Sequence, residues 1–64
     1  MIELNVLVPM HLSREIYNLE SEKFRIVHTS RELGGISQYF NIQTTEEEAT
    51  LLTLKFGKDK VWKR

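Results

Sequence analysis

The chain has 64 residues and no cysteine, and nine Lys and Arg residues balance nine Asp and Glu residues, for a formal net charge of zero. The lack of cysteine excludes disulfides, thiolate zinc sites and cysteine nucleophiles, and it favours a reducing compartment, so we expect a cytoplasmic protein. The neutral charge gives no whole-chain attraction to nucleic acid, and no apolar run is long enough to predict a membrane span.

The first strand is predicted over residues 1–8, where apolar and polar side chains alternate. Ile2, Leu4, Val6 and Val8 fall on one face, and this period of two is typical of a half-buried strand. Pro9 cannot donate to a sheet ladder, so we expect the strand to end there.

A short helix is predicted to follow, from Ser13 to about Glu20. Ser13 is a candidate N-cap, and Leu12, Ile16 and Leu19 recur at helical spacing. Two turns are not stable alone in water, so this helix requires burial of its apolar side against the sheet.

The second strand is predicted over residues 23–29. Its alternation places Phe24, Ile26 and His28 on one face, with Arg25 and Val27 on the other. We therefore expect His28 to lie against the core.

The segment Ser30–Gly35 is predicted to be a loop. Gly34 and Gly35 allow backbone angles that other residues avoid, which is typical of a turn or bulge. Arg31 and Glu32 beside this glycine pair are candidate contact residues, and an ordinary solvated hairpin loop is the alternative.

The third strand and the second helix are predicted from residue 36 to residue 57. Residues 36–43 alternate again, and Thr45 with Glu48 fits a capping box. Three consecutive glutamates suit the positive end of the helix dipole, and Gly57 is suited to end the helix. The apolar residues at helical spacing are Ala49, Leu52 and Phe56, joined by Leu51.

A fourth strand is predicted at residues 61–64, where Val61 and Trp62 are strand formers. The segment is too short for periodicity to decide whether Trp62 lies outside or in the core. The last ten residues are also basic, with four lysines and one arginine against Asp59. Cations at a helix C-terminus and lysines on an edge strand would explain this charge structurally.

This order of elements predicts a single α+β domain over residues 1–64. The expected fold is a small βαββαβ (ferredoxin-like) sandwich, with a four-stranded, mostly antiparallel sheet and two helices on one face. If the first helix is irregular, a three- or four-stranded sheet with one helix is the alternative. The predicted core is Ile2, Leu4, Val6, Val8, Ile16, Leu19, Phe24, Ile26, Ile36, Phe40, Ile42, Ala49, Leu52 and Phe56.

The sheet face without helices is the predicted binding surface. Tyr, Trp and Arg are enriched at the centres of protein interfaces, and a domain of about this size buries only about 60% of its unfolded surface. We therefore expect a non-enzymatic interaction module that binds a protein target, as an inhibitor or regulatory accessory protein of bacterial or viral type, or that forms a homodimer. The predicted surface residues are Tyr39, Trp62, Arg25, Leu7, Val27, Asn41 and Arg64, with Arg31 and Glu32 in the loop.

Two alternatives to this hypothesis remain. The same face could bind single-stranded RNA, with Tyr39 and Trp62 stacking on bases and Arg25, Lys63 and Arg64 contacting phosphates. A small domain could also leave apolar area exposed without any function.

Catalysis, a metal, a cofactor and a small-molecule substrate are not expected. His11 and His28 are the only histidines, and neither has a partner at metal-ligand spacing. The glycine pair lacks the spacing of a phosphate-binding loop, and a chain of this length has little room for a concave pocket.

Overall fold

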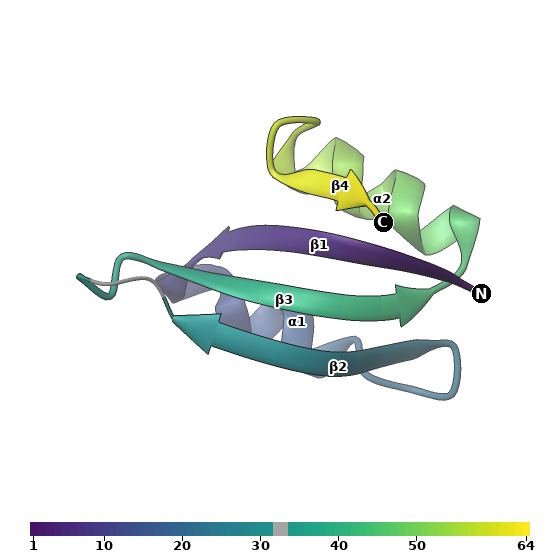
Figure 1. Cartoon of the computed structure of the whole chain (residues 1–64), viewed down its shortest axis with the longest axis horizontal. Coiled ribbons are helices and arrows are strands. Elements are labelled where there is room, and N and C mark those ends of the chain that lie inside the picture. The colour runs from purple at the N-terminus through teal and green to yellow at the C-terminus, as the bar shows by residue number, and fades with distance from the viewer. Residues whose placement is uncertain (32–33) are drawn as a thin grey trace.

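The computed structural model describes residues 1–31 and 34–64, which form an antiparallel sheet of four strands and two helices (Figure 1). The prediction of an α+β chain with such a sheet is therefore confirmed. Along the chain the elements are β1 (Ile2–Pro9), a 3-10 turn (Met10–Leu12), α1 (Ser13–Asn18), β2 (Phe24–Arg31), β3 (Ser37–Thr44), α2 (Glu46–Phe56) and β4 (Val61–Lys63).

The strands lie in the order β2-β3-β1-β4, and all neighbours are antiparallel. The two central strands, β1 and β3, pair over eight residues, from Ile2 opposite Thr44 to Pro9 opposite Ser37. Among the described strands, β4 pairs only with β1 and β2 pairs only with β3, so these two strands form the edges of the sheet.

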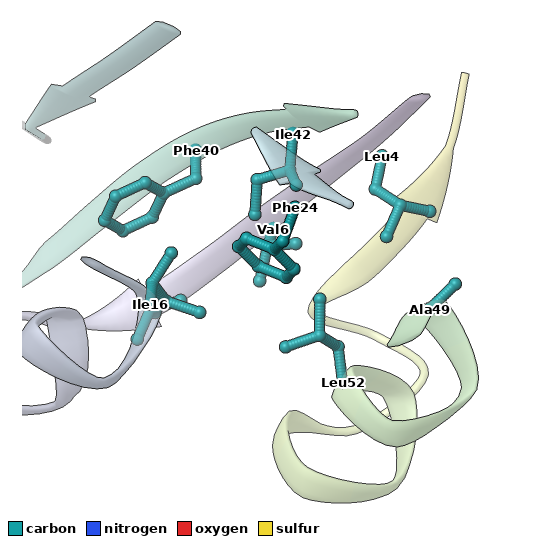
Figure 2. Packing of buried hydrophobic residues seen from close by; sticks show 9 residues of the cluster. Leu4, Val6, Ile16, Phe24, Phe40, Ile42, Ala49 and Leu52 are labelled. Carbon is teal, nitrogen blue, oxygen red and sulfur yellow. The ribbon is translucent and has the colours of Figure 1, made fainter. Parts of the chain in front are cut away.

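The core lies between one face of the sheet and both helices (Figure 2). Side chains from β1, β2 and β3 meet Ile16 of α1 and Leu52 of α2, so the two helices cover the same face. Within residues 1–31 and 34–64, all the buried apolar residues belong to the predicted core; they are Leu4, Val6, Val8, Ile16, Phe24, Phe40, Ile42, Ala49 and Leu52.

The predicted burial of two core residues is wrong. Leu19 is 40% exposed, because α1 ends at Asn18 and the residue no longer follows the apolar side of the helix. Ile36 is 75% exposed, because β3 begins only at Ser37 and the strand alternation does not extend to it. Both residues fit the apolar pattern, but α1 ends before Leu19 and β3 begins after Ile36.

A bulge in β2 reverses the predicted orientation of His28. Ile26 lies opposite Ile42, but His28 lies opposite Asn41, so Val27 is an extra residue in this strand. His28 therefore shares a face with Asn41 and is exposed, and its predicted packing against the core is wrong.

α1 begins differently from its prediction. A 3-10 turn precedes it, and Ser13 is the first helical residue, with its Oγ donating back to the carbonyl of Met10 at 2.7 Å. The helix holds its place through Ile16, which is fully buried, and Tyr17, whose ring packs edge-on against Phe40 with centroids 5.4 Å apart. The Tyr17 hydroxyl also accepts a hydrogen bond from the buried Gln38 amide at 2.9 Å.

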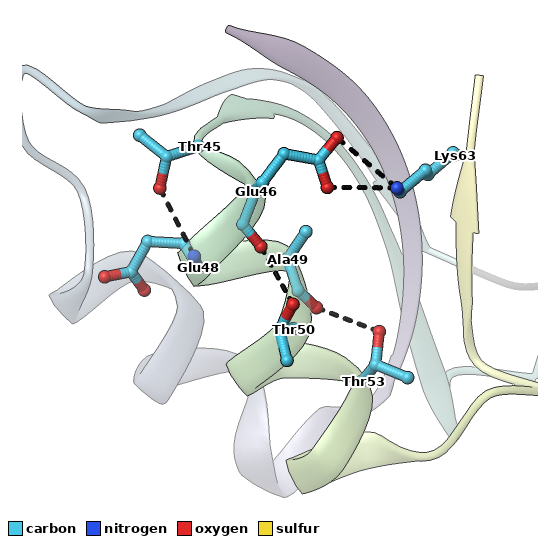
Figure 3. A network of polar contacts seen from close by, with 7 residues as sticks. All are labelled: Thr45, Glu46, Glu48, Ala49, Thr50, Thr53 and Lys63. Carbon is cyan, nitrogen blue, oxygen red and sulfur yellow. Dashed lines mark hydrogen bonds and ion pairs between the residues drawn. The ribbon is translucent and has the colours of Figure 1, made fainter.

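α2 begins as predicted, because Thr45 is its N-cap and the Thr45 side chain accepts from the Glu48 N–H at 3.2 Å (Figure 3). Gly57 ends the helix with φ of 100°. Leu51 is exposed, however, so its assignment to the apolar row of Ala49 and Leu52 is wrong. At 100° per residue Leu51 lies far around the helix from that row.

Candidate interaction surface

No described element covers the sheet face opposite the helices, which faces the viewer in Figure 1. We call it the open face; its residues on the central strands are Glu3, Asn5, Leu7, Tyr39, Asn41 and Gln43, which pair across β1 and β3. Because successive strand residues point to opposite sides, the buried residues of the same strands fix these side chains outward.

The register of β4 decides the position of Trp62. This residue lies opposite Asn5, so its ring is on the open face, where it is 44% exposed. Val61 lies opposite Val6 and packs against the core. The two possible phases of the last strand are thus resolved in favour of an outward tryptophan.

Tyr39 and Leu7 form the apolar centre of the open face. They lie directly opposite each other on β3 and β1, and both are half-buried by their neighbours. Leu7 is two residues from Asn5, the partner of Trp62, so the apolar groups continue diagonally toward β4.

A polar ladder crosses the middle of the face. The Asn41 amide donates to the Asn5 side chain at 2.9 Å and to the Leu4 carbonyl at 3.4 Å, and Asn41 is only 6% exposed. The Gln43 amide donates to one oxygen of the Glu3 carboxylate at 3.4 Å. The other oxygen of this carboxylate lies 3.2 Å from the Arg64 guanidinium. Asn41 therefore holds two central strands in register and offers little surface to a partner.

The remaining predicted surface residues lie apart from one another. Arg25, opposite Gln43, and Val27, at the bulge, are exposed on β2. Arg31 is exposed but lies opposite Gln38, so it is on the side of the sheet that the helices cover and not on the open face. Glu32 lies outside the described residues. Of the predicted surface, Tyr39, Leu7, Asn41 and Trp62 are thus brought together by register, and Arg31 belongs to the end of the sheet.

A groove between α2 and β4 was not predicted from the sequence. It encloses about 370 Å³ and is lined by apolar Leu4, Ala49, Leu54 and Val61, with Lys58 and Lys63 among its charged residues. Leu54 is 78% exposed. A helical projection of the sequence predicts the exposure of Leu54, because Leu54 and Leu51 fall on the side of the helix away from the Ala49 row, but it does not predict the groove.

The two histidines are exposed and lie on different elements, His11 in the turn before α1 and His28 on β2. Within residues 1–31 and 34–64, no three metal-binding side chains cluster, and no helix is long and apolar enough to cross a membrane.

Comparisons with protein families, with curated proteins and with solved structures found no match to this chain.

Proposed function

We propose that this chain is a non-enzymatic interaction module that binds a protein through the open face, either a second copy of itself or a foreign target that it regulates or inhibits. The observation that supports this function is the apolar run of Tyr39, Leu7 and Trp62 on a sheet face that no described element covers. Tyrosine and tryptophan present large, rigid contact area at low entropic cost, so they are typical anchors of an interface.

The size of the face fits such a role. The molecule measures 32 by 22 Å in the plane of Figure 1. One partner contributes about 800 Å² to an interface of standard size, which is the scale of this whole face. A small domain would gain from such an interface the apolar burial that its own core lacks.

A protein partner fits the face better than RNA does. Arg64 is paired with Glu3, whose carboxylate adds negative charge to the face, and Tyr39 is half-buried. Among the placed aromatic residues of the face, only Trp62 is well exposed for stacking on a base.

We also propose that the fold is a compact variant of the ferredoxin-like sandwich. Support comes from the alternation of strands and helices along the chain and from the position of β1 and β3 between β4 and β2. The shortness of α1, six residues, is the main departure from that pattern.

The test is the solution mass of three proteins, measured by light scattering and sedimentation from micromolar to millimolar concentration. They are the wild type, a Tyr39→Ser and Trp62→Ser double variant, and a control with Leu51→Ser and Leu54→Ser on α2. We expect a wild-type dimer, a folded monomer for the open-face variant and a dimer for the control. Far-UV circular dichroism shows whether each variant is folded.

A wild-type monomer over the whole range would refute self-association. The open face would then be tested with a photo-reactive amino acid at position 39. We expect it to cross-link one protein in cells, and we expect the cross-linked product to disappear when Trp62→Ser is added. If instead single-stranded RNA binds with an affinity that falls steeply with salt, the protein-binding function is wrong, because such dependence indicates phosphate contacts.

A further inference from the structure

We propose a second binding site, separate from the open face: the outer edge of β4 and the groove beside α2 bind an extended segment of a partner protein that carries apolar and acidic side chains. The segment adds to the sheet as a further strand. This mode of recognition uses main-chain hydrogen bonds for affinity and side-chain pockets for specificity.

The backbone of β4 is suited to this mode. The Lys60 carbonyl accepts from the Leu7 N–H at 2.9 Å, and the Arg64 N–H donates to the Glu3 carbonyl at 3.0 Å, so these residues face β1. Backbone groups of successive residues in an antiparallel strand point to opposite sides. Val61 and Lys63 therefore direct their N–H and C=O groups to the outer edge, where the sheet order has no further strand.

The groove lies on the core side of the same edge, where the side chains of Val61 and Lys63 also point. Leu4 and Ala49 contribute to its apolar lining, and the exposed Leu54 of α2 forms one wall. An added strand would place every second side chain over this groove, because side chains alternate between the two faces. One apolar side chain of the partner would thus be buried against Leu54 and Val61.

Lysines stand at opposite ends of the groove. Lys63 pairs at 3.0 Å with Glu46, the first residue of α2, as Figure 3 shows, and Lys58 follows Gly57 at the other end of the helix. α2 has 11 residues and is about 16 Å long. Two partner residues four positions apart on a strand are separated by about 13 Å, which is about 3 Å shorter than the helix.

Charge distinguishes the partner from a second copy. Residues 58–64 contain four cationic side chains and one carboxylate, for a net charge of +3, of which Glu46 and Glu3 offset two by pairing with Lys63 and Arg64. Among the described residues, Lys58 and Lys60 have no ion-pair partner. Pairing β4 with β4 of another copy would bring two such segments to a strand spacing of about 5 Å, and like charges that close are destabilising. An acidic segment meets the opposite charge.

The experiment is an NMR titration with the peptide acetyl-Thr-Glu-Thr-Leu-Thr-Glu-Thr-amide. Its leucine and both glutamates lie on one side of a strand, with the glutamates four positions apart. We expect saturable binding that shifts the backbone amides of Val61 and Lys63 and slows their hydrogen exchange. A peptide with lysine in place of glutamate is expected not to bind.

Matched variants locate the contacts. Leu54→Ala and Lys58→Glu should each weaken peptide binding by about tenfold, because one removes the groove wall and the other repels a glutamate. Leu51→Ala, on the same helix outside the groove, and Arg14→Glu, an exposed charge on α1, should leave the affinity within about twofold. All four positions are on helices or the turn after α2, outside the sheet. The NMR spectra of the titration also show whether each variant is folded.

Three results would overturn the proposal. They are equal binding of the lysine peptide, no binding at millimolar peptide, and shifts confined to Tyr39 and the Trp62 indole. The last result would assign the peptide to the open face and leave the proposed function intact. A Tyr39→Ser variant that still binds the peptide but does not dimerise would support the proposal, because it would show that peptide binding does not depend on the open face.

Discussion

Single polar residues specify how the strands of this sheet align. Asn41 bonds to Asn5, Gln38 donates to Tyr17 and to Thr29, and the Thr44 hydroxyl donates to the Lys23 carbonyl at 2.8 Å. Within the described residues, every buried side-chain nitrogen or oxygen has a hydrogen-bond partner. Since an unpaired buried polar group costs about 1–3 kcal/mol, a shifted register would lose these bonds at several positions together.

Gly57 gives the clearest prediction for one residue. Its φ of 100° and ψ of 152° lie in a region almost restricted to glycine, and an added Cβ would approach the Asp59 Oδ1 at 2.8 Å. We expect Gly57→Ala to lower the free energy of unfolding by about 1–3 kcal/mol, measured by urea denaturation. Lys58→Ala, one residue further along, is the control and should change it by less than about 0.5 kcal/mol.

A second variant separates the two causes of this cost. Asp59 is a flexible side chain, so Gly57→Ala combined with Asp59→Ala removes the close contact and leaves only the backbone strain. The double variant should keep most of the loss. Full recovery of stability in the double variant would contradict the role assigned to the backbone angle.

At the scale of elements, the β2 bulge gives a prediction about a deletion. Val27 is the extra residue between Ile26, opposite Ile42, and His28, opposite Asn41. Deleting Val27 would join two residues that already have the correct partners and orientations. We expect this deletion variant to fold with an unchanged β2-β3 register, detected as the same cross-strand NOEs between backbone protons.

Deletion of Tyr39 is the contrasting change. This residue lies on the central β3 strand, which pairs on both sides, so its removal would turn every following or preceding side chain to the opposite face. The Tyr39 deletion should therefore not fold. If the Val27 deletion is equally unfolded, the bulge is needed for the sheet and is not a tolerated insertion.

At the scale of the whole molecule, a small core makes each large side chain important. A chain of 64 residues is stabilised by about 3–10 kcal/mol. Phe40 is fully buried between the sheet and Tyr17 of α1, so Phe40→Ala should cost about 3–5 kcal/mol and remove most of the stability. Circular dichroism during urea or thermal unfolding measures this loss.

Phe56 provides the comparison for this prediction. It is only half-buried at the end of α2, so Phe56→Ala should cost clearly less than Phe40→Ala. Phe40→Leu keeps part of the buried volume and remains measurable if the alanine variant does not fold. Equal costs at positions 40 and 56 would show that the core is not centred on β3.

Much of the fold follows from local pattern in the sequence. The alternation in β1 and β3, the Thr45 cap and the glycine at 57 depend on neighbouring residues, so they predicted the elements and nearly all of the buried core. The assignment of Leu19 and Ile36 to the core is wrong because their burial depends on where α1 ends and where β3 begins. The position of Tyr39 on the open face is predictable from the same alternation, because the neighbours of a buried strand residue point to the opposite face of the sheet.

The rest was decided by pairing between distant segments. The extra residue in β2 is defined only by its partners on β3, and the phase of a three-residue β4 is defined only by its register with β1. The groove needs α2 and β4 side by side, and each lysine at its ends is placed by a different part of the chain. Local pattern therefore determined which residues are apolar on each element, whereas only tertiary pairing determined which surfaces those elements form together, because hydrogen-bond register joins residues far apart in the sequence.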